Sequence, residues 1–599
     1  MGQENLENKR HSLAHLLASV VLNLYPDTKM TLGPAIENGF YYDFEFSTPI
    51  SEKDLPKIEK EMKKILPHWQ TFEKFEVSAD EARKIFQGNE YKLELIDEIE
   101  KNNEQITLYY SGEKKQLPKI KDLLNPYTLY PNFLDLCRGG HVENPSKDIG
   151  PNTFKLDRIA GAYWRGNEKN QMLTRIYGLA FNSKKELEEF IKQREEAVKR
   201  DHRKIGKELN LFTFSDLVGA GLPLFTPKGR AMRDAIENKI SSIQEKFGFQ
   251  KVWIPHITKP DLYKTSGHWE KFGDELFKVK SRESDFVMKP MNCPHHTQIY
   301  ASQQRSYKDL PVRFVETTTV YRDEQSGELL GLSRVRSITQ DDGHIFCAPE
   351  QIPTEIKNVI EVIKEFYSSL GMWKDGNYRV ILSTRDPKDP ERYLGDDKIW
   401  QESETNLKNI ADNENLPYSI EKGEAAFYGP KLDFKFKDAI GREWQLATIQ
   451  LDFNMPERFG LEYTDKDGSK KTPVMIHRAI SGSLERFLSV IIEHFAGAFP
   501  LWLSPVQLKI LPVSEKHFEY ARAIGQELKQ NNLRIEIDES NENLGKKVRQ
   551  AKLEKVPYFL VLGDKETTEK NITLESRDEG NLGVFNIASL VEFLKKESS

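Results

Sequence analysis

The chain has 599 residues, of which 38% are hydrophobic and 30% charged, with a formal net charge of -6. This length predicts roughly three or four domains, and the negative net charge excludes a global positive field, so any nucleic acid would be held by local basic patches. The three cysteines, Cys137, Cys293 and Cys347, exclude a disulfide framework. The polar start MGQENLENKR and the lack of a membrane-length apolar run favour a cytoplasmic, multidomain enzyme without a membrane partner.

Residues 1–182 predict an α+β domain with two separated pairs of chemically active side chains. His11 and His15 share one face of the helical segment HSLAHLLASVVLNLY, and Cys137 and His141 follow in LDLCRGGH. Three imidazoles and a thiol have the composition of a zinc site. Buried structural histidines are the alternative, because the pairs lie far apart in the sequence. Residues 114–133, rich in proline and without a clear period, are expected to be a surface insertion.

A capping box, Ser183 to Glu186, predicts the start of a long charged helix that runs to about Leu209. Its apolar positions are sparse, which is typical of a connector between domains. Its basic end could touch phosphate, but a solvated face is the default interpretation.

Residues 210–503 predict a mainly antiparallel sheet around the stretch from Arg322 to Phe346. RFVETTTVYR and SRVRSITQ flank a long loop as two strands of a hairpin. Arg322 and Arg334 suit bidentate anion binding, although a charged, solvated hairpin is the alternative. The segment has no GxxxxGK[ST] loop and no GxGxxG turn, so any ATP would be held in another way.

Cys293, His344 and His477 each lie beside a predicted strand end. One thiolate and two imidazoles would make a three-ligand zinc site with an open position, although their spacing does not show that they meet. Residues 504–599 alternate three short apolar strands with helices, which predicts a small α/β domain.

Six motifs together resemble the class II aminoacyl-tRNA synthetases, and among them the bacterial-type threonyl-tRNA synthetase family: MNCPHH, RDEQSGELLGLSRVR, TQDDGHIF, AAFYGPKLDF, IQLDF and IHRAISGSLERF. HSLAHLLA and DLCRGGH resemble the family's editing domain. The resemblance implies an α+β multidomain chain: an editing domain at 1–182, a linker helix at 183–209, a class II catalytic domain with an antiparallel sheet at 210–503, and an α/β anticodon-binding domain at 504–599. It also implies that the family's N-terminal ubiquitin-like domain is absent.

The implied activity is ATP-dependent activation of L-threonine to threonyl-adenylate and its transfer to the 3′ end of tRNA(Thr), with hydrolysis of mischarged Ser-tRNA(Thr). The cofactors would be one Zn²⁺ and the Mg²⁺ that accompanies ATP, and motif 1 at 229–255 implies a homodimer. A synthetase-like RNA-binding regulator without catalysis is the alternative, favoured only by departures from the family pattern. These are His295 in place of glycine, RGGH in place of RGPH, and Glu575 in place of arginine.

The resemblance also assigns residues of the synthetic site. Zinc would be held by Cys293, His344 and His477. ATP would be held by Arg322, Glu324, Arg334 and Arg486. Catalysis is assigned to Arg322, Arg486, Lys431 and, for proton handling, His296. The amino acid and the adenylate would be surrounded by Met291, Gln340, Asp342, Tyr428, Gln445, Thr448, Gln450 and Ser483.

For editing, the resemblance implies that His11, His15, Cys137 and His141 would position water, and it adds Asp135 and Lys92 to this site. The family's editing site is metal-free, so the zinc interpretation of this cluster is withdrawn. Editing is needed because a metal can bind the threonine hydroxyl that valine lacks, whereas serine also has a hydroxyl and differs by one methyl group, worth about 1 to 3 kcal/mol. In the last domain, Glu566 would read an anticodon base, and Lys546, Lys547, Arg549 and Lys552 would form a basic helix.

Overall fold

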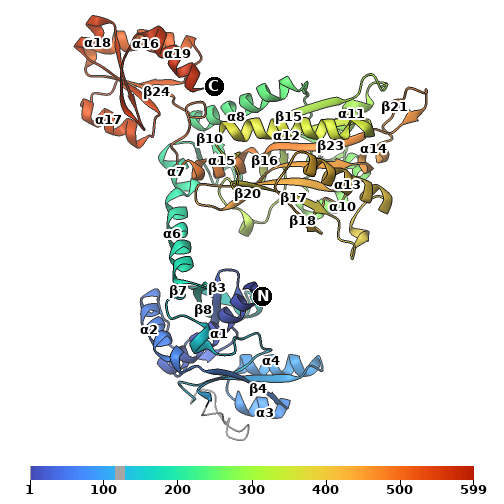
Figure 1. The fold of residues 1–599 in the computed structure, drawn as a ribbon, viewed down its shortest axis with the longest axis vertical. Helices are drawn as coiled ribbons and strands as arrows, with labels where there is room; N and C mark the ends of the chain where they lie inside the picture. Colours follow the sequence, from blue (N-terminus) through green and yellow to red (C-terminus); the bar gives the residue numbers. More distant parts are fainter. Residues whose placement is uncertain (1, 115–128, 599) are drawn as a thin grey trace. The chain divides into compact units, whose positions relative to one another are not determined.

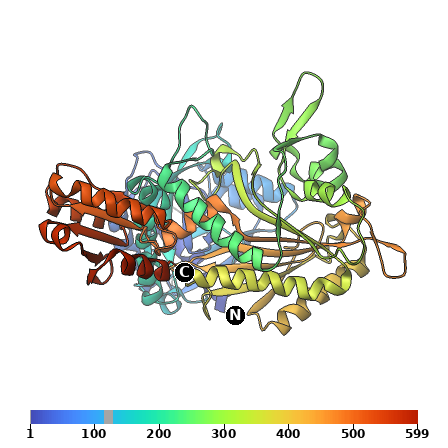
Figure 2. The same cartoon turned by 90° about the horizontal axis from the view of Figure 1, so that it is seen from above.

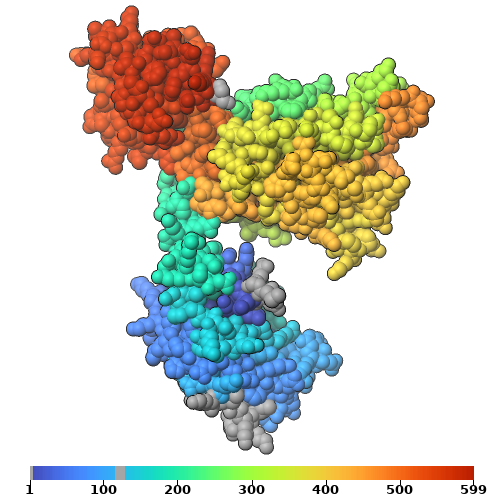
Figure 3. Space-filling model, in the orientation of Figure 1, coloured from blue at the N-terminus to red at the C-terminus, as the bar shows by residue number. Residues whose placement is uncertain are grey.

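The computed structural model describes residues 2–114 and 129–598, which form two compact units, Met1–Glu195 and Glu196–Ser599 (Figure 1). The expected insertion at 114–133 lies mostly outside the described residues. In the space-filling view the side chains of each unit pack into a continuous surface (Figure 3). Across the described residues, none of the helices combines the length and apolarity needed to span a bilayer.

The first unit packs the long helix α1 (Gly2–Leu24) against two antiparallel sheets. Its residues from Leu13 to Val21 are buried because apolar side chains recur on every face of this part of the helix. The first sheet contains β1 (Lys29–Met30), β2 (Ala35–Ile36), β3 (Gly39–Glu45), β7 (Phe154–Tyr163) and β8 (Met172–Ala180). The second contains β4 (Thr71–Val77), β5 (Ile106–Gly112) and β6 (Phe133–Leu136), and the other helices are α2 (Leu55–Ile65), α3 (Ala79–Ile85), α4 (Glu90–Lys101) and α5 (Pro145–Asp148).

The predicted linker helix is two helices, α6 (Lys184–Arg200) and α7 (His202–Glu208). The break falls at Asp201, whose backbone is not helical and whose side chain accepts a hydrogen bond from the Arg203 N–H. A carboxylate that caps a new helix ends the previous one, which the sparse apolar pattern did not reveal.

The second unit is built on an eight-stranded sheet with the order β11-β15-β16-β23-β20-β19-β17-β18. The predicted hairpin is confirmed as β15 (Val312–Tyr321) and β16 (Ser337–Cys347), which pair antiparallel. The other strands are β11 (Gln250–Lys251), β17 (Tyr378–Thr384), β18 (Tyr418–Lys422), β19 (Lys431–Lys437), β20 (Glu443–Asp452) and β23 (Val474–Ser483). Only the two edge pairs, β11 with β15 and β17 with β18, are parallel.

Helices cover this sheet and form its main core (Figure 1, Figure 2). The yellow helix α12 lies beside the green helix α8, and both bury apolar side chains in that core. The helices are α8 (Pro227–Lys246), α11 (Cys293–Ala301), α12 (Ile352–Ser369), α13 (Asp397–Asn413), α14 (Asn454–Arg458) and α15 (Leu484–His494). A smaller subdomain holds β12 (Ile257–Thr258), α9 (Pro260–Ser266), α10 (His268–Phe272), β13 (Lys278–Lys280) and β14 (Asp285–Met288), and short pairs are β9 (Phe212–Thr213) with β10 (Leu224–Phe225) and β21 (Tyr463–Thr464) with β22 (Lys470–Lys471).

The C-terminal part of this unit confirms the predicted small α/β arrangement. The three predicted strands, β24 (Leu508–Pro512), β25 (Ile535–Ile537) and β26 (Tyr558–Leu562), are parallel. Two antiparallel strands extend the sheet, β27 (Ile572–Ser576) and β28 (Gly580–Phe585). The helices are α16 (Phe518–Gln530), α17 (Leu544–Leu553), α18 (Asp564–Glu569) and α19 (Ile587–Glu597).

Candidate active sites

The metal-ligand candidates of the second unit meet on neighbouring strands. His344 on β16 pairs in register with His477 on β23, and Cys293 begins α11 beside them. One ligand atom from each of the three residues lies within 4.8 Å of the others, and all three side chains are buried. Non-consecutive strands therefore bring together residues that the sequence separates.

The surroundings of these residues suit a divalent cation. Asp452 Oδ2 lies 3.0 Å from His477 Nε2, and His296 Nδ1 lies 2.7 Å from His344 Nδ1. Each histidine therefore uses one ring nitrogen for support and keeps the other for a ligand bond, as metal-binding histidines do. Burial lowers the pKa of His344, which favours the neutral imidazole that a metal requires.

His296 lies beside one of the candidate metal ligands. It is fully buried, and its Nδ1 is paired with His344. This contact gives His296 a supporting role toward His344. Its assignment to proton handling stays a prediction, and its Nε2 has no partner in the described structure. His295, which replaces the glycine of the family pattern, is also buried. Neither of its ring nitrogens has a partner in the described structure, and burial lowers its pKa to about 4.

Strand β16 presents its residues alternately to two faces. Gln340, Asp342 and His344 share one face because side chains alternate along a strand. Asn292 fixes two of them, since its Nδ2 donates to Asp342 Oδ2 at 3.0 Å and to Gln340 Oε1 at 3.3 Å. The candidate substrate groups are therefore held beside the candidate metal ligands.

Strands β19 and β20 complete the wall of the site. Asp433, which sequence reasoning missed, accepts hydrogen bonds from Gln445 Nε2 at 2.7 Å and Thr448 Oγ1 at 2.8 Å, and its Oδ2 lies 2.7 Å from Lys431 Nζ. Tyr428 stacks on His477 with 4.8 Å between ring centroids, and its hydroxyl donates to Gln450. One buried carboxylate thus organises three of the predicted residues.

The predicted anion-binding arginines lie along the hairpin and on α15. Arg322 is packed over the Phe272 ring at 4.9 Å, and its Nη2 lies 3.2 Å from the Met291 sulfur. Arg334 donates to Glu324 and Glu328, each at 2.8 Å. The hydroxyl of Ser333, the residue before Arg334, lies 2.9 Å from that of Ser489 on α15, the helix that carries Arg486. Burial and then the charge of Arg334 lower the pKa of Arg486. Ser483 caps α15 by accepting a hydrogen bond from the Arg486 N–H.

Two further residues near the site were missed because no local pattern marks them. His268 Nε2 lies 3.7 Å from Cys293 Sγ, and burial lowers the pKa of His268 to about 3. Asp452 is the last residue of β20 and pairs with His477. In the sequence, the only sign of this role is that a single carboxylate follows the apolar residues of IQLDF.

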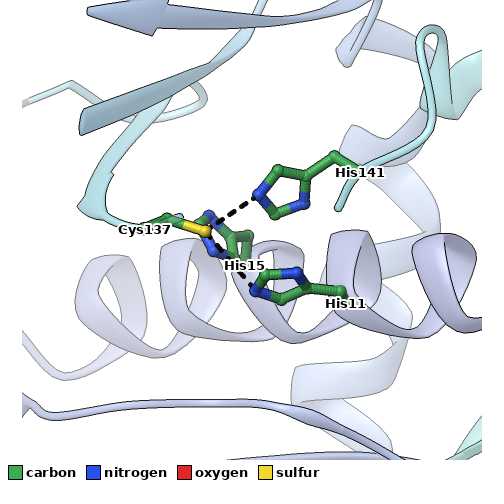
Figure 4. A group of neighbouring side chains, drawn as sticks. All are labelled: His11, His15, Cys137 and His141. Carbon is green, nitrogen blue, oxygen red and sulfur yellow. Dashed lines mark hydrogen bonds between the residues drawn. The ribbon is translucent and has the colours of Figure 1, made fainter. Parts of the chain in front are cut away.

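The first unit assembles the second predicted cluster (Figure 4). His11 and His15 project from α1 toward Cys137, whose Sγ lies 3.6 Å from His11 Nε2 and 3.2 Å from His141 Nε2. His11 Nδ1 can only donate to the Gly140 carbonyl at 3.2 Å, so its Nε2 is an acceptor. Burial raises the pKa of Cys137 to about 12 and lowers that of His141 to about 2. The cluster is therefore neutral at neutral pH.

A buried ion pair borders this cluster. Lys92 Nζ lies 2.5 Å from Asp135 Oδ1, and the Tyr42 hydroxyl donates to Asp135 Oδ2 at 2.6 Å. His11, Lys92 and Cys137 line a cavity of about 520 Å³. Five of the six predicted residues line this cavity: His11, His15, Lys92, Asp135 and Cys137. His141 is not among its lining residues and joins the site through its contact with Cys137. The four His and Cys donor atoms also lie within 4.8 Å of one another, so a metal ion would fit by composition.

The predicted anticodon residues are used inside their own domain. Glu566 accepts hydrogen bonds from the Gly563 N–H at 3.0 Å and from Thr573 Oγ1 at 3.2 Å. Lys547 is buried and donates to the carbonyls of Pro512 and Asp538, so it does not belong to the exposed basic face of α17.

Two family profiles and several known proteins match this chain. The profile of the tRNA synthetase class II core domain (G, H, P, S and T) matches residues 277–495, and that of the anticodon binding domain matches residues 507–597. A threonine–tRNA ligase of Gloeobacter violaceus is 47% identical over 99% of this chain and 92% of that protein. A threonine–tRNA ligase of Thermus thermophilus is 46% identical over 98% of this chain and 88% of its own length.

Two solved structures are also similar. One is the RNA binding domain of threonyl-tRNA synthetase from Cryptosporidium parvum Iowa II, with a TM-score of 0.63 and 36% identity, covering 66% of this chain and 98% of that one. The other is the putative threonyl-tRNA synthetase ThrRS-1 from Aeropyrum pernix, with a TM-score of 0.60 and 29% identity, covering 66% of this chain and 96% of that one.

Proposed function

The chain belongs to the threonine–tRNA ligase family, and on that premise we propose that it activates threonine at a zinc site in residues 210–503 and edits at a separate site in residues 1–182. The enzyme is a threonine–tRNA ligase that uses ATP with Mg²⁺ and tRNA. Residues 183–209 would link the two domains, and residues 504–599 would bind the anticodon. The match of the anticodon binding domain to residues 507–597 supports the last assignment.

The observation that carries the synthetic site is the meeting of Cys293, His344 and His477. Arg322 contacts Met291, two residues before Cys293. Cys293, His344 and His477 would hold zinc, which when bound would supply Lewis-acid coordination for the amino group of threonine and for its side-chain hydroxyl, a group that valine lacks. Asp342, held by Asn292, would accept a hydrogen bond from that hydroxyl.

The arginines would neutralise the phosphates of ATP. Arg322 lies beside Met291, next to the candidate threonine site, and would stabilise the charge that develops at the α-phosphate. Arg334 and Arg486 would hold the γ-phosphate, since the turn that carries Arg334 is fixed to α15 through Ser333 and Ser489 and a multiply charged anion would match both cations. Glu324 would be released from Arg334 to contact the adenine.

Editing is supported by the neutral cluster of the first unit. His11 Nε2 and His141 Nε2 both lie beside the Cys137 thiol, and the unprotonated His11 Nε2 could accept a hydrogen bond from a water molecule oriented there. The Lys92–Asp135 pair fixes the wall of the cavity. We propose hydrolysis of Ser-tRNA(Thr) here, without a metal.

A homodimer is supported by exposed apolar side chains in and near motif 1. Trp253 is 75% exposed and Leu217 is 100% exposed, and Trp253 lines a cavity of about 290 Å³ beside α8. Because the resemblance places motif 1 at 229–255, we propose that these two exposed apolar side chains lie in the dimer interface.

One experiment tests both sites: ATP–pyrophosphate exchange and tRNA charging with threonine and with serine. We expect Cys293→Ala to abolish threonine-dependent exchange, because the zinc site loses its thiolate. We expect the double variant His11→Ala, His15→Ala to exchange normally and to accumulate Ser-tRNA(Thr). Full exchange by Cys293→Ala would contradict the zinc role, and no accumulation of Ser-tRNA would contradict the editing role.

A further inference from the structure

His202 lies outside both proposed sites, in the first turn of α7, and is buried. Its Nδ1 lies 2.7 Å from Glu493 Oε1, and its backbone N–H donates to the same oxygen at 3.0 Å. Glu493 is in the last turn of α15, the helix that carries Arg486. Because an ionised carboxylate can only accept, the proton of the neutral ring is on Nδ1 and Nε2 has a free lone pair.

This lone pair of Nε2 accepts a hydrogen bond from the turn at residues 330–334, which lies in the loop of the hairpin between β15 and β16. His202 Nε2 accepts a hydrogen bond from the Leu332 N–H at 3.1 Å. Leu332 is fully buried and sits in a tight turn closed by two backbone hydrogen bonds between Leu330 and Arg334. A second anchor joins the turn to α15, since the hydroxyls of Ser333 and Ser489 lie 2.9 Å apart. The turn is therefore fixed to α15 directly and through His202.

Gly331 shows how close this approach is. Its φ of +50° is unusual for other residues, and a Cβ at this position would lie 2.3 Å from His202 Nε2. Only glycine allows the imidazole to reach the backbone of the turn. The contact therefore requires both the imidazole of His202 and a glycine at position 331.

The contacts of His202 and Ser333 oppose the electrostatic repulsion between Arg334 and Arg486. Arg334 directly follows Ser333, and Arg486 lies one turn before Ser489 on α15, so the contact between these two serines keeps the two cations on adjoining segments. The charge of Arg334 also contributes to the lowered pKa of Arg486. Two like charges repel in the absence of an anion. Glu324 and Glu328 offset part of this repulsion by pairing with Arg334, but they do not attach the turn to α15. Attachment comes from His202 and Ser333.

A metal site at His202 is the competing interpretation, because Asp201, His202 and Glu493 could hold a cation by composition. The carboxylate of Asp201 is already paired with Arg203, and that of Glu493 with Arg442. Both ring nitrogens of His202 are also used. The cluster therefore offers no uncommitted ligand.

We propose that His202 is a positioning residue for ATP: it holds the turn at residues 330–334 against α15, so that Arg334 and Arg486 face one γ-phosphate pocket. This role rests on the proposed assignment of these two arginines to ATP. It connects the start of the catalytic unit to both ATP-binding elements without contacting the nucleotide.

Two variants of the full-length enzyme separate positioning from packing. In His202→Asn the amide nitrogen replaces Nδ1 and keeps the bond to Glu493, but nothing replaces Nε2. In His202→Gln the amide oxygen reaches the position of Nε2 and accepts from the Leu332 N–H. In threonine-dependent ATP–pyrophosphate exchange we expect His202→Asn to raise KM for ATP about tenfold, the loss expected of roughly one hydrogen bond. We expect kcat and KM for threonine to stay within about twofold of the wild type, and His202→Gln to restore KM for ATP.

His494→Asn is the matched control, because His494 is a neighbouring histidine at the end of α15 and its Nδ1 has no partner in the described structure. We expect it to leave KM for ATP unchanged. Equal changes of KM in His202→Asn and His202→Gln, or an unchanged KM in His202→Asn, would overturn the positioning role. Absence of threonine-dependent exchange in the wild type would instead contradict the proposed function.

Discussion

At the scale of single residues, the editing cluster is a set of groups that burial keeps uncharged. His15 and His141 are both enclosed, and burial lowers the pKa of each. Charge is confined to the adjoining pair of Lys92 and Asp135, which is also buried and satisfied by Tyr42. Uncharged imidazoles can accept protons from water. Because burial opposes their protonation, the stability of the first unit should also fall at acidic pH.

The pH dependence follows from His141. Its pKa is lowered to about 2 in the folded protein, so the unfolded chain takes up a proton below about pH 6.5 while the folded one does not. The contribution of His141 to the free energy of unfolding is therefore full above about pH 6.5. As the pH falls below that value, this free energy decreases by at most about 1.4 kcal/mol per pH unit. We expect His141→Asn to lose less stability than the wild type between about pH 7 and about pH 5, measured by urea unfolding. His68→Asn, at an exposed histidine of the same unit, should behave like the wild type; equal acid sensitivity of His141→Asn would contradict this account.

At the scale of elements, β16 joins the substrate site to the core. Asp342 faces the site, whereas Asp341 faces the helices and binds Arg478, with 2.8 Å between Oδ1 and Nη1. Asp341 Oδ2 also accepts from the backbone N–H groups of Ile480 and Ser481 in β23. The two adjacent carboxylates therefore have unrelated roles, one toward the ligand and one toward the fold.

Asp341 provides a test of this division. Asp341→Asn leaves the buried guanidinium of Arg478 without an opposite charge, so we expect a loss of about 3 to 5 kcal/mol in the free energy of unfolding. Urea unfolding monitored by tryptophan fluorescence would measure it. Asp323→Asn, at a half-exposed carboxylate of the same hairpin, should change stability by about 0.5 kcal/mol or less. Equal stability of the two variants would refute the assignment.

At the scale of the whole molecule, the proposed synthetic and editing sites belong to different compact units. Each unit has its own core, so a change in one site should leave the other active. The exposed apolar side chains Trp253 and Leu217 belong to the second unit and mark the surface that we propose for the homodimer.

The homodimer is tested at Trp253. A glutamate in place of this exposed ring would place a charge in the proposed interface, so we expect Trp253→Glu to shift the wild-type dimer toward monomer in sedimentation velocity. Val584→Glu, at another well-exposed apolar position in the C-terminal part, should remain dimeric. A monomeric wild type, or a dimeric Trp253→Glu, would contradict the proposed interface.

The sequence by itself determined the elements and the family. The alternation of β-branched residues predicted the hairpin of β15 and β16, and the ordered motifs indicated a threonyl-tRNA synthetase, which the relatives confirm. Local periodicity could show this because it depends only on neighbours in the chain.

Only the tertiary structure decided which distant groups meet. The strand order places β16 beside β23 and β23 beside β20, which brings His344, His477 and Asp452 together. The same packing pairs His296 with His344 and places His202 against the turn at residues 330–334. These contacts join segments that are remote in sequence, and they depend on strand order and helix packing, which no local pattern records.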